Sequence, residues 1–175
     1  MNGFTLHNLT HSSASQINQR SEAPHMWCAQ DLFGRRGTFS AAGKSGQLVE
    51  EAVVNVLARG FTVEDAIAHM SGQYNIFIAL GASDADRQRG AAMSAMLQQA
   101  LEVLKEYGEP EFEKDITGAL KQKAIEVNCK GDGWELPLVG YLDFVFEGKK
   151  TVFDLKTSMR SSSELSTSHR RQACI

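Results

Sequence analysis

The chain has 175 residues, of which 42% are hydrophobic and 22% charged, and its formal net charge is −3. These values are ordinary for a soluble globular protein and predict a single domain, residues 1–175, with one core. They exclude a membrane-spanning protein, because no apolar run approaches the length of a span, and the N-terminus lacks the pattern of a secretory signal. Three scattered cysteines without C-x₂-C spacing are typical of a reducing compartment, so we expect a cytoplasmic protein.

The first 44 residues predict two short helices followed by a loop. Ser12 or Ser13 is a good N-cap for a helix that runs towards Arg20. Proline is favoured at the first position of a helix, so a second helix is expected from Pro24 to Leu32. Residues 33–44 are rich in Gly, Ser, Ala and Arg, a composition typical of a loop.

Residues 45–120 predict a helical part with three longer helices. The first follows Ser45-Gly46, carries apolar residues at 49, 53, 56 and 57 on one face, and ends at Gly60. Glu50 lies at the border of that apolar face. The second helix begins at Thr62, and the third covers residues 84–107. The expected apolar positions of the third helix are Ala91, Ala95, Leu97, Leu101 and Leu104.

Residues 121–155 predict a three-stranded antiparallel meander. Lys121 to Cys129 is the first strand, and Lys130-Gly-Asp-Gly133 is a hairpin turn. Trp134 to Phe146 is the return strand. A second turn of Glu, Gly and two Lys residues then leads into the third strand, Thr151 to Leu155.

Two aspartates interrupt the apolar strands of this meander. Strand interiors are poor in Asp, and two buried carboxylates repel each other unless a cation lies between them. A hard divalent ion such as Mg²⁺ suits paired oxygen ligands, so Asp143 and Asp154 predict a metal site. Because side chains alternate along a strand, Lys156 is expected on the same face as Asp154, with Leu155 pointing into the core. The alternative is an exposed hairpin with two solvated Asp residues, which the apolar flanking residues disfavour.

The sequence Gly-Tyr-Leu-Asp143, followed by Phe-Asp154-Leu-Lys156-Thr-Ser, resembles the motif of the PD-(D/E)XK nuclease superfamily. Its form is similar to the RecB-like and phage-type exonuclease branch of that superfamily. The similarity extends to the N-terminus, where a Ser-rich helix start precedes a Pro-x-x-Trp segment at residues 24–27.

Two further matches come from the same resemblance. Gly46 precedes Glu50 by four residues, and this spacing marks the acidic residue of the first helix in the resembled families. At the C-terminus, His169 and Gln172 match the first two members of a His-x-x-Gln-x-x-x-Tyr helix that touches nucleic acid or the site. The chain stops at Ile175, one residue short of the Tyr, and lacks the closing helix and strands of that family.

The resemblance implies a restriction-endonuclease-like α/β fold, in which N-terminal helices pack on a central mixed sheet that begins with the meander. It implies that Asp143, Asp154, the Leu155 carbonyl and Glu50 hold one or two Mg²⁺ or Mn²⁺ ions. Lys156 would orient or deprotonate the attacking water and stabilise the pentacovalent phosphate.

The implied substrate is DNA, and the implied role is exonuclease digestion in phage or prophage recombination or repair, with a phage recombination protein as a further partner. The charge distribution is compatible with DNA, because basic segments at residues 1–48 and 149–175 flank an acidic middle. The expected contacts to backbone phosphates are Lys149, Lys150, Arg160, Arg170 and Arg171.

Two other functions stay open at this point. One is an endonuclease on the same fold, of the restriction or junction-resolving type. The other is an inactive, truncated relative that binds DNA or a protein, because residues 159–175 begin a helix that the sequence leaves incomplete. Ring-shaped assemblies occur among the resembled exonucleases, and a sheet edge exposed by the short C-terminus would favour a homo-oligomer. A small-molecule enzyme is disfavoured, since the chain has no Gly-rich phosphate loop, H-E-x-x-H motif or nucleophile elbow.

Overall fold

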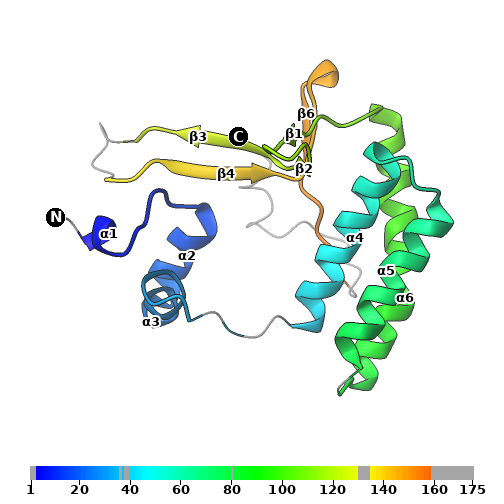
Figure 1. Ribbon diagram of the computed structural model, residues 1–175, viewed down its shortest axis with the longest axis horizontal. Helices are drawn as coiled ribbons and strands as arrows, with labels where there is room; N and C mark the ends of the chain where they lie inside the picture. The colour runs from blue at the N-terminus through cyan, green and yellow to red at the C-terminus, as the bar shows by residue number, and fades with distance from the viewer. Residues whose placement is uncertain (1–2, 36, 38–39, 80, 130–134, 159–175) are drawn as a thin grey trace.

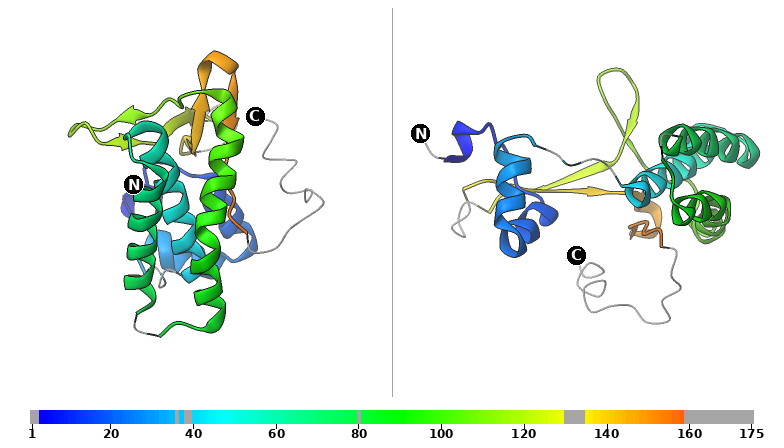
Figure 2. Two further views of the ribbon diagram at one scale, coloured as in Figure 1. Left: turned by 90° about the vertical axis from the view of Figure 1, so that its right-hand side faces the viewer. Right: turned by 90° about the horizontal axis from the view of Figure 1, so that it is seen from below.

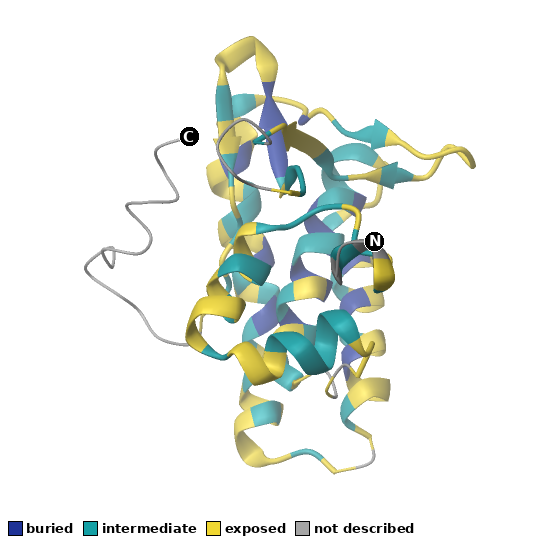
Figure 3. Cartoon of the chain, turned by 90° about the vertical axis from the view of Figure 1, so that its left-hand side faces the viewer, coloured by how far each residue is buried: buried dark blue, intermediate teal, exposed yellow. Residues whose placement is uncertain are grey.

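Three long helices and one β-hairpin build the core of the chain (Figure 1). The computed structural model describes residues 3–35, 37, 40–79, 81–129 and 135–158. Helices α4 (Ala41–Ala58), α5 (Val63–Ile78) and α6 (Asp84–Leu104) contact one another along their lengths. Their buried apolar side chains form one cluster with Phe144 and Phe146 of the hairpin. Figure 3 shows the buried residues concentrated where these elements meet.

The two predicted N-terminal helices are confirmed, a short helix that was not predicted precedes them, and all of these segments lie outside this core. They are α1 (Gly3–Leu6), α2 (Ala14–Glu22), α3 (Pro24–Trp27) and a π-helical segment, η1 (Cys28–Leu32). Ser13 caps α2 in a capping box with Gln16, each side chain bonding the other's backbone N–H. Helices α2 and α3 and the segment η1 contain no buried residue, so the contacts of this part are peripheral.

Helix α4 begins earlier than the sequence suggests. Its N-cap is Ser40, whose hydroxyl accepts from the backbone N–H of Gly43, so the last residues of the expected loop are helical. The Gly, Ser and Ala residues there favour a loop by composition, but tertiary packing overrides this preference. Ser45 is fully buried, and Gly46 lies against Thr157 at the distant end of the described chain.

The other two long helices begin where they were expected, α5 after the predicted cap Thr62 and α6 at Asp84. Thr62 caps α5, which continues through Tyr74 to Ile78, and Ser83 caps α6. The prediction that Ala91 and Ala95 of α6 face the core is wrong, because both are exposed and Met93 is buried instead. The buried side of α6 is thus set by Met93, Leu97 and Leu104, whose larger apolar side chains exclude more water than alanine does.

The strands do not form the expected meander or a single mixed sheet. The described residues form three separate two-stranded antiparallel sheets. Their members are β1 (Glu113–Lys114) with β2 (Leu120–Lys121), β3 (Lys123–Val127) with β4 (Leu138–Leu142), and β5 (Phe144–Phe146) with β6 (Thr151–Phe153). The predicted return strand is divided at Asp143, because its first part pairs with β3 and its second part with β6. The α/β class is confirmed.

The two larger hairpins have different surroundings. All three residues of β5 are buried. On the edge of β5 that does not pair with β6, the backbone N–H of Glu111 donates to the Val145 carbonyl. Tyr107, in the short 3₁₀ helix η2 (Lys105–Tyr107), packs on Phe146 and Phe153. By contrast, β3 is largely exposed and reaches from the α4–α6 side towards the N-terminal helices (Figures 1 and 2).

Among the described residues, no helix combines the length and apolarity needed to cross a bilayer.

Candidate active site

Asp143 occupies the break between the two larger hairpins. The β3–β4 ladder ends at the pair Lys123 and Leu142, and the β5–β6 ladder starts at the pair Phe144 and Phe153. Asp143 therefore lies between two ladders, where its side chain is half-buried and its backbone is outside both. An acidic residue is tolerated here because the strand pairing changes partner at this point.

The side chain of Gln122 joins Asp143 to Glu50 of helix α4. Its amide Nε2 donates to Oε1 of Glu50 and to Oδ1 of Asp143, each at 2.8 Å. Gln122 lies between β2 and β3, immediately before the residue that ends the β3–β4 ladder. Gln122 was not predicted as a site residue, since a Gln between two Lys residues gives no local signal of a site.

The segment after β6 completes the cluster. The backbone N–H of Leu155 donates to Oδ2 of Asp143 at 2.8 Å, and the Leu155 side chain packs against the core. Asp154 and Lys156, on either side of Leu155, are exposed, and Lys156 Nζ lies 2.5 Å from Asp154 Oδ1. The predicted inward direction of Leu155 is confirmed, although the strand itself ends at Phe153.

Gly46 explains how this segment approaches helix α4. A Cβ atom on Gly46 would lie 3.0 Å from the Thr157 hydroxyl, closer than ordinary van der Waals contact. Gly46 is one helical turn before Glu50, so the segment after β6 packs on the same side of α4 as Glu50. The missing side chain at Gly46 allows Asp154, Lys156 and Glu50 to approach one another.

Two carboxylates at this site, Glu50 and Asp143, have pKa values above their ordinary values. Burial raises the pKa of Glu50 above its ordinary value, and the charges of Asp143 and Asp154 raise it further, against the opposing effects of Gln122 and Lys156. Burial likewise raises the pKa of Asp143, where the Leu155 N–H bond lowers it and Asp154 raises it. These effects agree with the hydrogen bonds that join Glu50 and Asp143 through Gln122, and Asp143 to the backbone between Asp154 and Lys156.

The chemistry of these donors fits a hard divalent cation, but their present spacing does not yet form a coordination shell. Carboxylate oxygens are the ligands that Mg²⁺ and Mn²⁺ prefer, and a cation would offset the burial and the repulsion that raise the pKa values of Glu50 and Asp143. Among the described residues, however, no three His, Cys, Asp or Glu side chains are grouped closely enough to hold a metal. The Gln122 amide bonds both Glu50 and Asp143, so it must move aside for a cation to lie between them.

The remaining predicted residues divide into two groups. Lys149 bonds the Glu106 carbonyl and lies over the Tyr107 ring, while Lys150 adopts a left-handed conformation in the turn after the 3₁₀ segment η4 (Glu147–Lys149). Lys149 therefore has a clear packing role in the structure. The others lie outside the described residues, namely Arg160, His169, Arg170, Arg171 and Gln172.

Comparison with protein-family models, with curated proteins and with solved structures finds no match to this chain.

Proposed function

We propose that this protein is a metal-dependent nuclease that hydrolyses phosphodiester bonds of DNA. The observation that carries the proposal is the cluster at the junction of the two hairpins, where Gln122 bonds Glu50 and Asp143, the Leu155 N–H bonds Asp143, and Lys156 pairs with Asp154. These residues come from separate parts of the sequence, and their proximity costs electrostatic free energy in the absence of a bound cation. Such costs are concentrated at functional sites, where a ligand compensates them.

In this proposal the carboxylates bind the metal ion and Lys156 contacts the phosphate or the water. Asp143, Asp154 and Glu50 would hold Mg²⁺ or Mn²⁺, which supplies charge neutralisation at the phosphate and a more acidic water molecule. Lys156 would donate a hydrogen bond to a phosphate oxygen or orient the attacking water. The Leu155 N–H keeps Asp143 oriented, and its bond to Oδ2 favours the ionised carboxylate that a metal ion requires.

The test is digestion of end-labelled linear DNA and of closed-circular DNA with Mg²⁺ or Mn²⁺, with and without a chelator. Loss of linear DNA alone would support an exonuclease, and cutting of the circle would support an endonuclease. Lys156→Ala should abolish cleavage. A matched control is Lys105→Ala, which removes a similarly exposed lysine that pairs with Glu102. Equal activity of the two variants would refute the assignment of Lys156.

A non-catalytic DNA- or protein-binding role is the second candidate. The bonds of Gln122 to Glu50 and Asp143 favour it, because they can stabilise the site without a metal ion. An amide that satisfies two carboxylates without a cation can stabilise the fold as a purely structural bridge. In that case, calorimetric titration with Mg²⁺ or Mn²⁺ would show no binding that depends on Asp143, and no DNA would be cut.

A further inference from the structure

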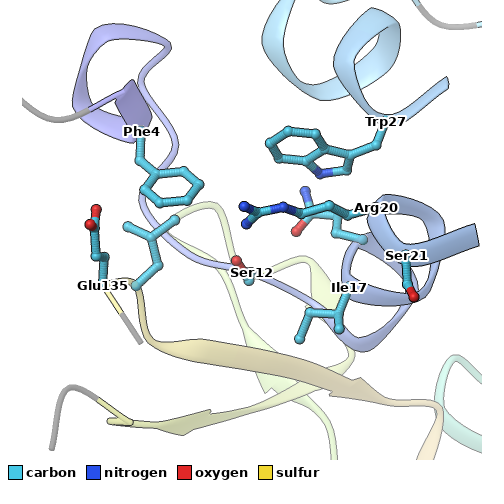
Figure 4. A pocket seen from close by; sticks show the side chains of 9 residues that line it. Phe4, Ser12, Ile17, Arg20, Ser21, Trp27 and Glu135 are labelled. Carbon is cyan, nitrogen blue, oxygen red and sulfur yellow. The ribbon is translucent and has the colours of Figure 1, made fainter. Parts of the chain in front are cut away.

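A pocket separate from the candidate active site lies between the N-terminal helices and the segment just before β4. Its volume is about 500 Å³, and its walls come from α1, α2, α3 and residues 135–136 (Figure 4). This volume falls within the range of small-ligand sites, which is roughly 300–1,000 Å³. The pocket contains a cation, Arg20, which the proposed active site does not use.

Arg20 is held between two aromatic rings. Its guanidinium carbon lies 5.7 Å from the centre of the Phe4 ring and 5.2 Å from that of Trp27 (Figure 4). Both distances are within the range of attractive cation–π contacts. Trp27 therefore packs on this guanidinium.

The two ring contacts leave the hydrogen-bond donors of the guanidinium available. A cation–π contact is made with the face of the ring and uses none of the N–H donors, which point outward in the plane of the guanidinium. Within the described part of the chain, no carboxylate lies at ion-pair distance from Arg20. Glu135 also lines the pocket, but in Figure 4 it lies on the far side of Phe4 from the guanidinium.

These features fit a phosphate group better than an apolar ligand. A guanidinium with a fixed orientation forms paired hydrogen bonds to phosphate oxygens at a small entropic cost. The hydroxyl-bearing residues Ser12 and Ser21 line the same pocket and can supply further donors. The aromatic rings of Phe4 and Trp27 add faces on which a nucleotide base could stack.

We propose that this pocket is a second DNA contact, in which Arg20 binds a backbone phosphate of a strand whose scissile bond lies at the candidate active site. The proposal rests on the nuclease function proposed above. Leu136 of the pocket wall and Asp143 lie seven residues apart, with β4 between them, so their backbones are at most about 23 Å apart at 3.3 Å per residue. Along one strand of a duplex, this separation corresponds to about seven nucleotides.

The experiment measures binding of a fluorescent 20-base-pair duplex by anisotropy, with chelator present to prevent cleavage and at salt concentrations from 50 to 200 mM. Arg20→Ala should weaken binding about tenfold, as expected for one charge-assisted contact. It should also reduce the salt-dependence slope by about 0.9, the value for one phosphate. The matched control is Arg87→Ala, which removes an exposed arginine paired with Asp84 on α6. Equal affinity and slope for the two variants would overturn the proposal.

A second pair of variants covers the case in which loss of Arg20 disturbs the packing of α1 on α3. Ser21→Glu places a negative charge at an exposed pocket wall and retains the Arg20 guanidinium with its two ring contacts. Asn18→Glu adds the same charge to an exposed position of α2 that does not line the pocket. We expect Ser21→Glu to weaken DNA binding more than Asn18→Glu, with circular dichroism unchanged in both. Equal binding would mean that Arg20 only joins the helices.

The outcomes separate this proposal from the nuclease function. DNA binding that depends on Arg20, without cleavage, would support the pocket and refute the nuclease. Cleavage with no effect of Arg20→Ala would support the nuclease and refute the pocket. A wild-type protein that binds no DNA would refute the pocket as a DNA contact. Titration with a nucleoside triphosphate tests the other phosphate source, since Arg20-dependent binding of the nucleotide alone would replace DNA as the ligand.

Discussion

The close packing of Thr157 on helix α4 can be tested by adding one methyl group to Gly46. The position is within helix α4, where replacement of Gly by Ala normally stabilises a protein by about 0.5–1 kcal/mol. Here the new Cβ would lie 3.0 Å from the Thr157 hydroxyl, and ordinary contact begins at 3.4 Å. The Thr157 side chain, or the segment after β6 that carries it, must therefore move by a few tenths of an ångström, which costs about 1–3 kcal/mol in a packed site.

Gly72 provides the control for this substitution. It lies within helix α5, and a methyl group added there would have no heavy atom within 4 Å, so Gly72→Ala should gain the full helical benefit of about 0.5–1 kcal/mol. Thermal unfolding followed by circular dichroism can resolve the difference from Gly46→Ala, because about 1 kcal/mol shifts the midpoint by roughly 2–4 °C in a chain of this size. The displacement should also reduce DNA cleavage by Gly46→Ala alone, since Lys156 adjoins Thr157.

A double-mutant cycle identifies the contact responsible. Thr157→Ala removes the hydroxyl that the added methyl group approaches, so Gly46→Ala with Thr157→Ala should recover most of the lost stability. Equal stabilisation by Gly46→Ala and Gly72→Ala would refute the close packing of Thr157 on α4. A coupling free energy below about 0.3 kcal/mol would do the same, because this is the level expected of independent positions.

Three further outcomes follow from the site and the core. Glu50→Gln should raise the unfolding temperature at pH 7 and have little effect below pH 4.5, because a raised folded-state pKa costs stability as the pH rises above the ordinary value of 4.5; an effect larger in acid would contradict this sign. Gln122→Leu removes the donor shared by Glu50 and Asp143, so we expect a loss of about 1–3 kcal/mol in urea unfolding at pH 7 and a smaller loss at pH 4. Leu97→Ala in the fully buried core should cost about 2–5 kcal/mol without changing the pH dependence.

Local chemistry was sufficient to predict the helices and part of the candidate site. The hydroxyl of Ser13 and that of Thr62 cap helices where the sequence places them, because capping depends on residues only three positions apart. Asp154, Leu155 and Lys156 also have the expected directions, since alternation along an extended chain persists one or two residues beyond the strand.

Features that depend on distant partners were not predicted. Asp143 interrupts the apolar pattern, but the sequence does not show that the strand changes partner there, which becomes evident only once β3 and β6 are placed. Gln122 acquires its role from Glu50, which is distant in sequence, and no local pattern marks such a contact. The approach of Thr157 to Gly46 likewise joins residues that are far apart in sequence, so no local pattern indicates it.

The bond between Gln122 and Glu50 has a consequence for the order of folding. It joins residues 72 positions apart, whereas the contacts among α4, α5 and α6 connect neighbouring segments. Closing a long chain segment costs more entropy than closing a short one, so we expect the helices to associate before the carboxylates are brought together. During synthesis, the helical part would then acquire its shape while Asp143 and Lys156 are still absent from the site. A partly folded chain would therefore be unable to cut DNA, and any catalytic capacity would arise only when the last described segment is in place.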